Sequence, residues 1–370
     1  MKLLIVDTYY NEFINNFWRK NPGLEEQPYN KQLGALLGQC FGTSDFYSYN
    51  LTQLGHKAWD TIANDETLQK RWADEHALQI SKGALDRLQM LPFLYRFIGR
   101  PGWVQTIVLE QIKFYKPDIL YMQDLSILSP ATLRKAKKNV KLVVGQIASS
   151  LPPRKNIMAF DLIITSFPHY VKTFRKMGVP SEYLKIAFEP RILRKIKKQR
   201  KEYDVTFVGS FTPQHRAGTK TLELVSKKIP IHVWGRGTEF LSPTSSLQKN
   251  YHGATWGLDM YKILARSKIV INRHINVAKN YANNMRLYET TGMGAMLMTD
   301  SKKNLNDLFE VGKEVVVYNS PEDLLRKIEY YLTHDEERKK ITKAGQKRTL
   351  REHIYKRRMK ELANILQKYI

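Results

Sequence analysis

The chain has 370 residues, of which 42% are hydrophobic and 11% aromatic, so it is long enough for two or three domains and too apolar to be disordered. Its single cysteine, Cys40, excludes an internal disulfide and indicates a reducing, cytoplasmic compartment. No apolar run approaches the roughly 18 residues of a membrane span, and the apolar stretch at residues 2–6 is too short for a signal segment.

The charge is strongly positive, with 60 Lys and Arg against 35 Asp and Glu and a net charge of +25. Chains this basic commonly bind nucleic acid, anionic lipid or an acidic polymer. Basic residues gather at residues 134–138, at 194–201 and near the C-terminus. Because no zinc-finger spacing, RNA-binding aromatic motif or basic zipper is present, we expect no nucleic-acid partner and consider an anionic membrane surface or a polyanionic acceptor instead. The alternative is that these residues only solvate the surface.

Buried strands alternate with helical segments along the first half of the chain. Lys2–Asp7 is a continuous apolar run that ends in a polar residue, as expected for a parallel strand buried on both faces. Residues 30–115 are predicted to be mainly helical. Three further strands are predicted at Pro117–Asp124, Lys141–Gln146 and Asp161–Ser166, and a helix at Val171–Met177. This alternation indicates βαβ units and a parallel sheet.

Polar residues at the carboxyl ends of these strands are candidates for chemistry, because open α/β sheets bind ligands there. Asp124 and His169 are the two candidate bases, and the alternative for each is a structural polar cap. Asp7 is either an acid at the ligand edge or the polar terminator of its strand, and we favour the terminator.

Residues 88–103 combine large apolar side chains with Arg96 and Arg100, between proline and glycine breaks. Such a segment suits a bilayer interface, with aromatic rings at the headgroup level and arginines on lipid phosphate. The alternative, which we favour, is a core-facing helix with a kink at Pro92.

A second α/β series follows the charged run Arg191–Glu202, which lacks aromatic residues and is the predicted interdomain linker. Strands are predicted at residues 203–211, 231–237, 268–273 and 315–318, and helices from residue 321 to the C-terminus. Glycines end the first two strands and allow a ligand close to the backbone, and polar residues follow in the loops. The candidates for donor contact in this region are Gly209, Ser210, Arg216, Gly235 and His252. The histidines lack the spacing of a zinc site, so no metal is expected.

Residues 283–300 are predicted to form an approach loop, a short helix, a glycine-bearing turn at Gly292 and Gly294, and a buried strand. Asn284, Arg286 and Glu289 lie where that helix begins. A helix N-terminus suits a phosphate group, and the Arg286 guanidinium adds a cation for the same phosphate. An ionised Glu289 suits the two hydroxyls of a ribose. The alternative is an amphipathic helix in which Arg286 and Glu289 form a solvated i,i+3 pair.

The pattern Asn284, Arg286, Glu289 and Gly294 resembles the nucleotide-sugar signature of GT-B glycosyltransferases, in particular the CgeB-like spore-protein branch of the glycosyl transferases group 1. Residues 334–338 and 353–358 are similar to the C-terminal signature of the same group. Many retaining members carry a second glutamate eight positions before the first, where this chain has Tyr281. The resemblance therefore leaves open whether the reaction retains or inverts the anomeric configuration.

The resemblance implies two Rossmann-like domains facing across a cleft, with the last helix crossing back to the first domain. We expect an acceptor domain at residues 1–190 with the helix at about 355–370, and a donor domain at residues 203–354. The implied activity is transfer of a sugar from a nucleotide-sugar donor to a glycan, lipid-linked or cell-wall acceptor, with no metal or other cofactor. A helix N-terminus and Arg286 would stabilise the leaving diphosphate, and the enzyme would be cytoplasmic or peripheral at the inner face of the membrane. The alternative is a non-catalytic GT-B-like protein that binds a polyanion or a membrane surface.

Overall fold

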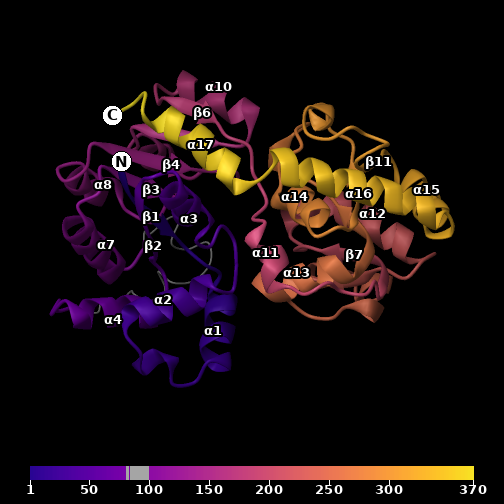
Figure 1. Ribbon diagram of the computed structural model, residues 1–370, viewed down its shortest axis with the longest axis horizontal. Helices are drawn as coiled ribbons and strands as arrows, with labels where there is room; N and C mark the ends of the chain where they lie inside the picture. Colours follow the sequence, from indigo (N-terminus) through magenta and orange to yellow (C-terminus); the bar gives the residue numbers. More distant parts are fainter. Residues whose placement is uncertain (81–82, 84–99) are drawn as a thin grey trace. The chain divides into compact units, whose positions relative to one another are not determined.

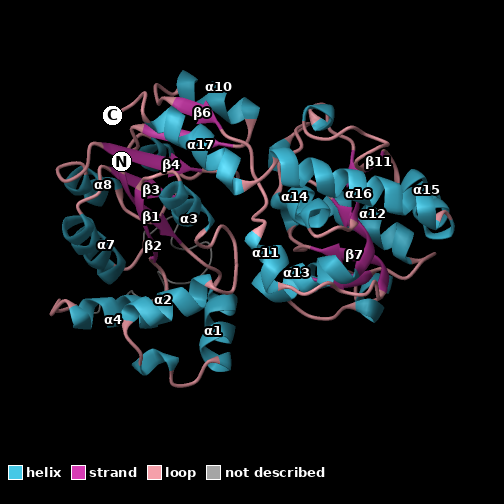
Figure 2. Ribbon diagram, in the orientation of Figure 1, coloured by secondary structure: helices cyan, strands magenta, loops and turns pink. Residues whose placement is uncertain are grey.

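The computed structural model describes residues 1–80, 83 and 100–370, so most of the interface segment predicted at 88–103 lies outside the described residues. The chain forms two compact units (Figure 1). Unit 1 comprises Met1–Leu184 and Met359–Ile370, and unit 2 comprises Lys185–Arg358. Each unit is built on one parallel sheet flanked by helices, which confirms the predicted α/β class with two parallel sheets (Figure 2).

The sheet of unit 1 has six parallel strands in the order β2-β1-β3-β4-β5-β6. The strands are β1 (Lys2–Asp7), β2 (Lys57–Ile62), β3 (Ile119–Met122), β4 (Leu142–Gln146), β5 (Leu162–Thr165) and β6 (Ser181–Tyr183). The helices are α1 (Asn11–Lys20), α2 (Tyr29–Leu37), α3 (Phe46–Gln53), α4 (Glu66–Glu75), α7 (Gly102–Tyr115), α8 (Pro130–Ala136), α9 (Arg154–Ile157) and α10 (Pro168–Lys176). The four strands predicted from continuous apolar runs are confirmed, because such runs are typical of strands buried on both faces.

The prediction that residues 30–115 are mainly helical is wrong at β2. This strand pairs in parallel with β1, from Lys2 opposite Lys57 to Asp7 opposite Ile62. As an edge strand it is only partly buried over its first four residues, and Lys57 is exposed. Its sequence therefore has no continuous apolar run, and pairing with β1 decides its conformation.

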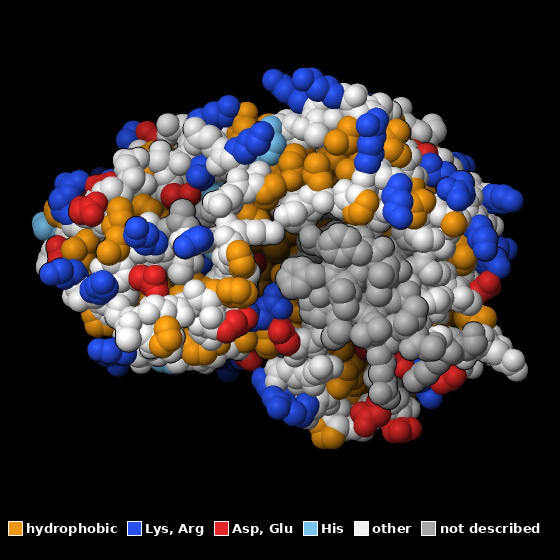
Figure 3. Space-filling view, turned by 180° about the vertical axis from the view of Figure 1, so that it is seen from behind, with side chains coloured by type: hydrophobic (Ala, Val, Ile, Leu, Met, Phe, Trp, Pro, Cys, Tyr) orange, Lys and Arg blue, Asp and Glu red, His pale blue; other side chains and the backbone are white. Residues whose placement is uncertain are grey.

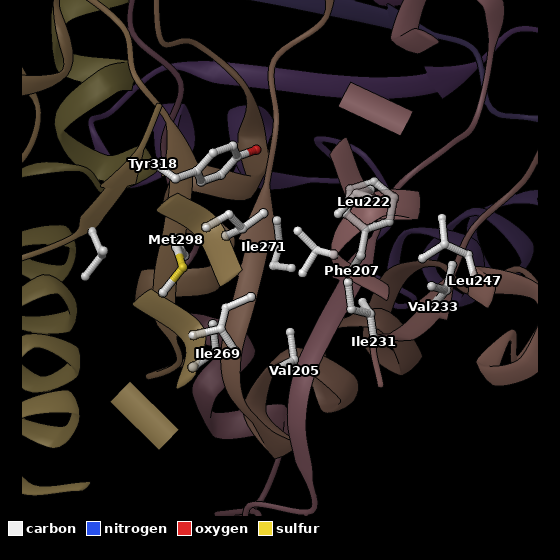
Figure 4. Close-up of a cluster of buried hydrophobic side chains, with 14 of the residues drawn as sticks. Val205, Phe207, Leu222, Ile231, Val233, Leu247, Ile269, Ile271, Met298 and Tyr318 are labelled. Carbon is white, nitrogen blue, oxygen red and sulfur yellow. The ribbon is translucent and has the colours of Figure 1, made fainter. Parts of the chain in front are cut away.

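The sheet of unit 2 has five parallel strands in the order β11-β10-β9-β7-β8. The strands are β7 (Tyr203–Val208), β8 (His232–Trp234), β9 (Ser267–Asn272), β10 (Met296–Asp300) and β11 (Val316–Tyr318). The helices are α11 (Arg191–Lys195), α12 (Arg216–Ser226), α13 (Gly257–Arg266), α14 (Met285–Gly292), α15 (Pro321–Thr333) and α16 (Asp335–Glu352). Phe207 and Ile271 from neighbouring strands pack with Leu222 of α12 in a buried apolar cluster, which fixes that helix on the sheet (Figure 4).

Helix α17 (Tyr355–Leu366) begins in unit 2 and continues in unit 1. Its first residue is fixed in unit 2, where the Tyr355 amide donates to the Phe188 carbonyl at 3.0 Å. Beyond its other end, Tyr369 Oη donates to Glu182 Oε1 at 2.8 Å within unit 1. The predicted linker Arg191–Glu202 contains α11 and belongs to unit 2, and the change of unit falls between Leu184 and Lys185.

Lys and Arg side chains are spread over the face shown in Figure 3 and do not gather in one place. Arg100 and Trp103, the described end of the predicted interface segment, are both buried. Among the described helices, none is both long enough and apolar enough to span a bilayer.

Candidate functional site

Helix α14 holds Arg286 and Glu289 in direct contact. Arg286 Nη1 donates to Glu289 Oε2 at 2.7 Å, and Tyr261 Oη donates to Glu289 Oε1 at 3.2 Å. Arg286 Nε also donates at 3.2 Å to the carbonyl of Val208, the last residue of β7. The two charged side chains are only 16% and 6% exposed. The alternative interpretation is therefore right that an i,i+3 pair forms, but Glu289 is buried and Arg286 is half-buried, so the pair is not a solvated one.

This ion pair keeps the capacity to bind a ligand. Each carboxylate oxygen has two lone pairs, and the contacts of Glu289 use one on each oxygen. A guanidinium has five N–H donors, and the contacts of Arg286 to Glu289, Val208 and Met260 involve Nε and Nη1 only. The pair thus presents acceptor sites and donor sites side by side.

Asn284 precedes α14 but does not cap it. Its Nδ2 donates to Asn272 Oδ1 at 2.7 Å and to the Arg273 carbonyl at 3.0 Å, both at the end of β9. The side chain makes no capping bond to α14, and its buried Oδ1 has no hydrogen-bond partner among the described residues. Asn284 therefore fastens the start of α14 to the carboxyl edge of the sheet and leaves the first N–H groups of the helix uncapped by this side chain.

Gly235, Gly292 and Gly294 are required by close packing, by backbone conformation or by both. Gly235 has φ 152°, and a Cβ there would lie 1.8 Å from the Gly209 carbonyl oxygen. Gly294 has φ 68° and makes the predicted turn before β10. Gly292 is instead the last residue of α14, and a Cβ there would lie 2.6 Å from the Phe188 ring. The prediction that Gly292 serves the turn is wrong, because close packing is what excludes a side chain.

His252 lies among aromatic rings beside the edge strand β8. Its ring stacks on Trp234 with centroids 4.4 Å apart, and its Nε2 lies 2.9 Å from His232 Nδ1. His252 thus lies beside β8, and β7 separates β8 from β9, the strand that precedes α14 along the chain. Arg216 is the exposed first residue of α12. The roles predicted for these two residues stay predictions.

Sequence reasoning missed Arg273, which organises the loop after β7. Arg273 Nη2 donates to the Ser210 carbonyl at 3.0 Å, and Nη1 donates to Thr219 Oγ1 at 2.9 Å and to the His215 carbonyl. The guanidinium also lies over the Phe207 ring at 4.9 Å. Burial lowers the pKa of Arg273 to about 10, so it stays charged at neutral pH. Its position at the polar end of the strand predicted at residues 268–273 was the available signal.

A second missed group joins the ends of β9 and β10. His274 Nδ1 lies 2.6 Å from Asp300 Oδ1, and Lys302 Nζ lies 3.0 Å from Asp300 Oδ2. Although burial opposes it, the hydrogen bond from His274 and the charge of Lys302 lower the pKa of Asp300 to about 2. The ionised Asp300 thus accepts a hydrogen bond from His274 Nδ1. His274 Nε2 is buried and has no hydrogen-bond partner among the described residues.

The two candidate bases lie at the carboxyl edge of unit 1. Asp124 follows β3, where its Oδ1 accepts from the Ser126 amide at 2.8 Å and its Oδ2 lies 3.5 Å from Arg100 Nη2. His169 lies in the first turn of α10, against the rings of Phe167 and Tyr170. Within residues 1–80, 83 and 100–370, no group of three His, Cys, Asp or Glu side chains is placed to hold a metal ion.

Comparison with known proteins identifies a glycosyl transferase-like segment in the second half of the chain. Residues 190–364, which include α14 and the residues around it, match the family model described as glycosyl transferase-like. This segment is a glycosyltransferase domain. The expectation of a glycosyltransferase enzyme is thus confirmed at the level of the family, and the narrower resemblance to the CgeB-like branch stays a prediction. No curated protein matches the chain in sequence.

Solved structures similar to this glycosyltransferase confirm the GT-B fold. HepE of Anabaena in complex with UDP-glucose is 13% identical with a TM-score of 0.59, and the match covers 100% of both chains. Sucrose-phosphate synthase of Thermosynechococcus elongatus is 9% identical with a TM-score of 0.58, over 100% of this chain and 99% of that one. AviGT4, a glycosyltransferase involved in avilamycin A biosynthesis, is 10% identical with a TM-score of 0.56, over 100% of this chain and 98% of that one.

The position of the second glutamate of many retaining relatives is occupied by an aromatic residue. Lys303 Nζ lies 4.2 Å from the centroid of the Tyr281 ring, in a cation–π contact. A phenol beneath an ammonium group cannot supply the negative charge of a carboxylate. The chain therefore departs from those relatives in the chemistry of this position.

Proposed function

We propose that this glycosyltransferase moves a hexose from a UDP-hexose to a hydroxyl of a glycan, lipid-linked or cell-wall acceptor. The observation that carries the proposal is the largely buried Arg286–Glu289 pair on α14, beside N–H groups that Asn284 does not cap. A buried ion pair is costly to desolvate, so its presence at the ligand edge of the sheet favours a binding role. The UDP-glucose in the similar HepE structure supports the choice of donor.

The two side chains would divide the donor between them. Glu289, held by Tyr261 and Arg286, would accept hydrogen bonds from the ribose hydroxyls with its second lone pairs. Arg286 would use Nη2 on the diphosphate, together with the first N–H groups of α14. The positive charge would neutralise the diphosphate as it leaves, so the proposal requires no metal ion. We expect UDP release from UDP-hexose to be unchanged by EDTA.

Ligand-induced stabilisation tests the donor site. We expect UDP and UDP-glucose to stabilise the full chain by about 2.7 kcal/mol at a concentration near 100 Kd. Arg286→Ala and Glu289→Gln should abolish most of this stabilisation. Arg326→Ala is the matched control, because Arg326 Nη2 forms an i,i+3 pair with Asp323 at 2.6 Å but is 76% exposed on α15.

The results separate the proposal from its alternative. Stabilisation by UDP-glucose followed by UDP release supports an enzyme. Stabilisation without release with any acceptor would favour a non-catalytic GT-B-like protein. Full stabilisation of both Arg286→Ala and Glu289→Gln would show that the donor binds elsewhere.

We further propose that unit 1 contacts an anionic membrane surface that presents the acceptor. Within unit 1, residues 131–184 contain ten Lys and Arg but only two acids, Asp161 and Glu182. Both acids are already paired, Asp161 with Lys137 at 2.5 Å and Glu182 with Arg175 at 3.4 Å. We expect cosedimentation with phosphatidylglycerol vesicles that is lost in high salt. Equal binding to phosphatidylcholine vesicles would contradict this part of the proposal.

A further inference from the structure

Helix α16 carries positive charge for which the proposed donor site has no use. Residues 338–358 of unit 2 contain ten Lys and Arg but a single acid, Glu352. Four exposed cations in and near the middle of α16 recur at spacings of three or four residues. Since a helix turns once in about 3.6 residues, these cations lie along one side of it. They form what we call the α16 stripe: Lys340, Lys343, Lys347 and Arg351.

The stripe faces away from the body of unit 2. The side of α16 that packs inward includes Ile341, Gly345 and Thr349, which are buried. Thr349 Oγ1 lies 2.6 Å from Thr291 Oγ1 of α14, and a Cβ on Gly345 would clash with the Glu314 carbonyl. Helix α16 thus packs closely against its neighbours in unit 2, among them α14 and α15 (Figure 1). The stripe is therefore presented on a rigid support.

The charges of the stripe are not neutralised within the chain. Among the residues that the structure describes, the three lysines of the stripe form no side-chain hydrogen bond or ion pair. The acids at its two ends are already engaged, Glu336 with Lys339 at 2.9 Å and Glu352 with Arg351 at 2.6 Å. Like charges at these spacings destabilise a helix. The stripe therefore does not serve the stability of α16, and its charge complements an anion outside the chain.

The shape and the chemistry of the stripe favour a linear polyanion over a membrane or a nucleic acid. Its four cations span roughly 16 Å along the helix, since each residue adds about 1.5 Å. From residue 335 to residue 358, all of which the structure describes, no large apolar or aromatic side chain is exposed. Helices that lie on membranes bury an apolar face beneath their basic residues, and single-stranded nucleic acids stack their bases on aromatic rings. The stripe offers neither contact.

We propose that the α16 stripe binds an acidic glycan, that is, a linear carbohydrate chain bearing carboxylate or phosphate groups. The choice of a glycan over other polyanions rests on the function proposed above, in which a glycan is one of the acceptors. The ammonium groups of the three lysines pair with successive anionic groups of the chain. Because α16 is separate from the Arg286–Glu289 pair in sequence and in its contacts, this binding requires no sugar donor.

Binding of a labelled oligogalacturonate, whose sugars each carry a carboxylate, tests the proposal on the full chain. Fluorescence anisotropy should show binding at low salt that weakens as the salt concentration rises, and a neutral dextran of similar length should not bind. Replacing the three lysines together, by Lys340→Gln, Lys343→Gln and Lys347→Gln, should weaken binding roughly tenfold or more. Glutamine and lysine have similar helix propensities, so the thermal midpoint should not fall.

Three other exposed lysines of unit 2, which lie outside α16, provide the matched control. The control variant combines Lys227→Gln, Lys228→Gln and Lys249→Gln and so removes the same charge. Because salt screens charges that are distant from the ligand, this variant should bind oligogalacturonate within about twofold of the wild type. Equal losses of affinity in both variants would show that net charge alone attracts the chain, and would overturn the proposal.

The remaining outcomes separate the glycan from other partners. No binding of oligogalacturonate by the wild type at low salt would overturn the proposal. Cosedimentation with phosphatidylglycerol vesicles, proposed above for unit 1, should be unchanged in the stripe variant; if it falls while glycan binding persists, the stripe contacts lipid instead. Tighter binding of a DNA duplex through the same lysines would make nucleic acid the partner. If the stripe binds the glycan but neither UDP nor UDP-glucose stabilises the chain, only the donor function fails.

Discussion

Replacing Asp7 with Asn should stabilise the protein, and the gain should grow as the pH rises. Burial raises the pKa of Asp7 from its ordinary 3.8 to about 7. Between these values the folded state binds a proton that the unfolded state has lost, so the wild-type chain loses stability with increasing pH. At about 1.4 kcal/mol for each pH unit, the full loss above pH 7 is on the order of 4 kcal/mol. Asparagine stays neutral and keeps an oxygen for the Thr8 amide, so it avoids this loss.

Urea unfolding of the full chain at several pH values from about 4 to about 8 measures the effect. The variant and the wild type should have similar free energies of unfolding near pH 4 and should diverge steadily up to about pH 7. Asp118→Asn provides a control of opposite sign. The hydrogen bond from the Lys2 amide and the neighbouring Lys141 lower the pKa of Asp118, although partial burial of its carboxyl group acts in the opposite direction. Asp118 therefore stabilises the folded state at pH values above its ordinary pKa, and Asp118→Asn should destabilise the protein at neutral pH. Parallel curves for Asp7→Asn and the wild type across this range would refute the reasoning.

Four further predictions, on three variants, concern unit 2. Arg273→Met should destabilise the chain by roughly 2–4 kcal/mol, because the Ser210 carbonyl and Thr219 lose a buried donor. Calorimetry measures the free energy of unfolding, and a decrease of less than about 0.5 kcal/mol would contradict the prediction. In the same variant the pKa of His215, which burial and then the charge of Arg273 lower to about 4, should rise, as an NMR titration would show. Tyr261→Phe should weaken UDP binding by about 1 kcal/mol through the lost bond to Glu289, whereas unchanged affinity in isothermal calorimetry would exclude the tyrosine from the site. Gly235→Ala should destabilise by roughly 1–3 kcal/mol, since its Cβ would lie 1.8 Å from the Gly209 oxygen, and a thermal midpoint equal to the wild type would show that the loop relaxes freely.

The features that sequence alone predicted are those set by neighbours along the chain. Continuous apolar runs predicted β1, β3, β4 and β5, because a strand buried on both faces is apolar whichever strands lie beside it. The pairing of Arg286 with Glu289 could be anticipated for the same reason, since residues three apart lie on one helix face. Whether that pair was solvated or buried depended on Tyr261 and on the end of β7, which lie far away in sequence.

Tertiary structure decided the features that depend on which strands are neighbours. Strand β2 has no continuous apolar run in its sequence, and it forms because it pairs in parallel with β1. Asp7 was expected to be a strand terminator, yet the order β2-β1-β3 brings it to a cluster with Thr43 and Gln123, residues 36 and 116 positions later in the chain. His274 and Asp300 meet for the same reason at the ends of β9 and β10. The sequence alone determined which side chains were available for chemistry, whereas strand order determined which of them lie in contact. The reason is that hydrogen bonds and desolvation act over a few ångströms of space, whatever the separation of the residues along the chain.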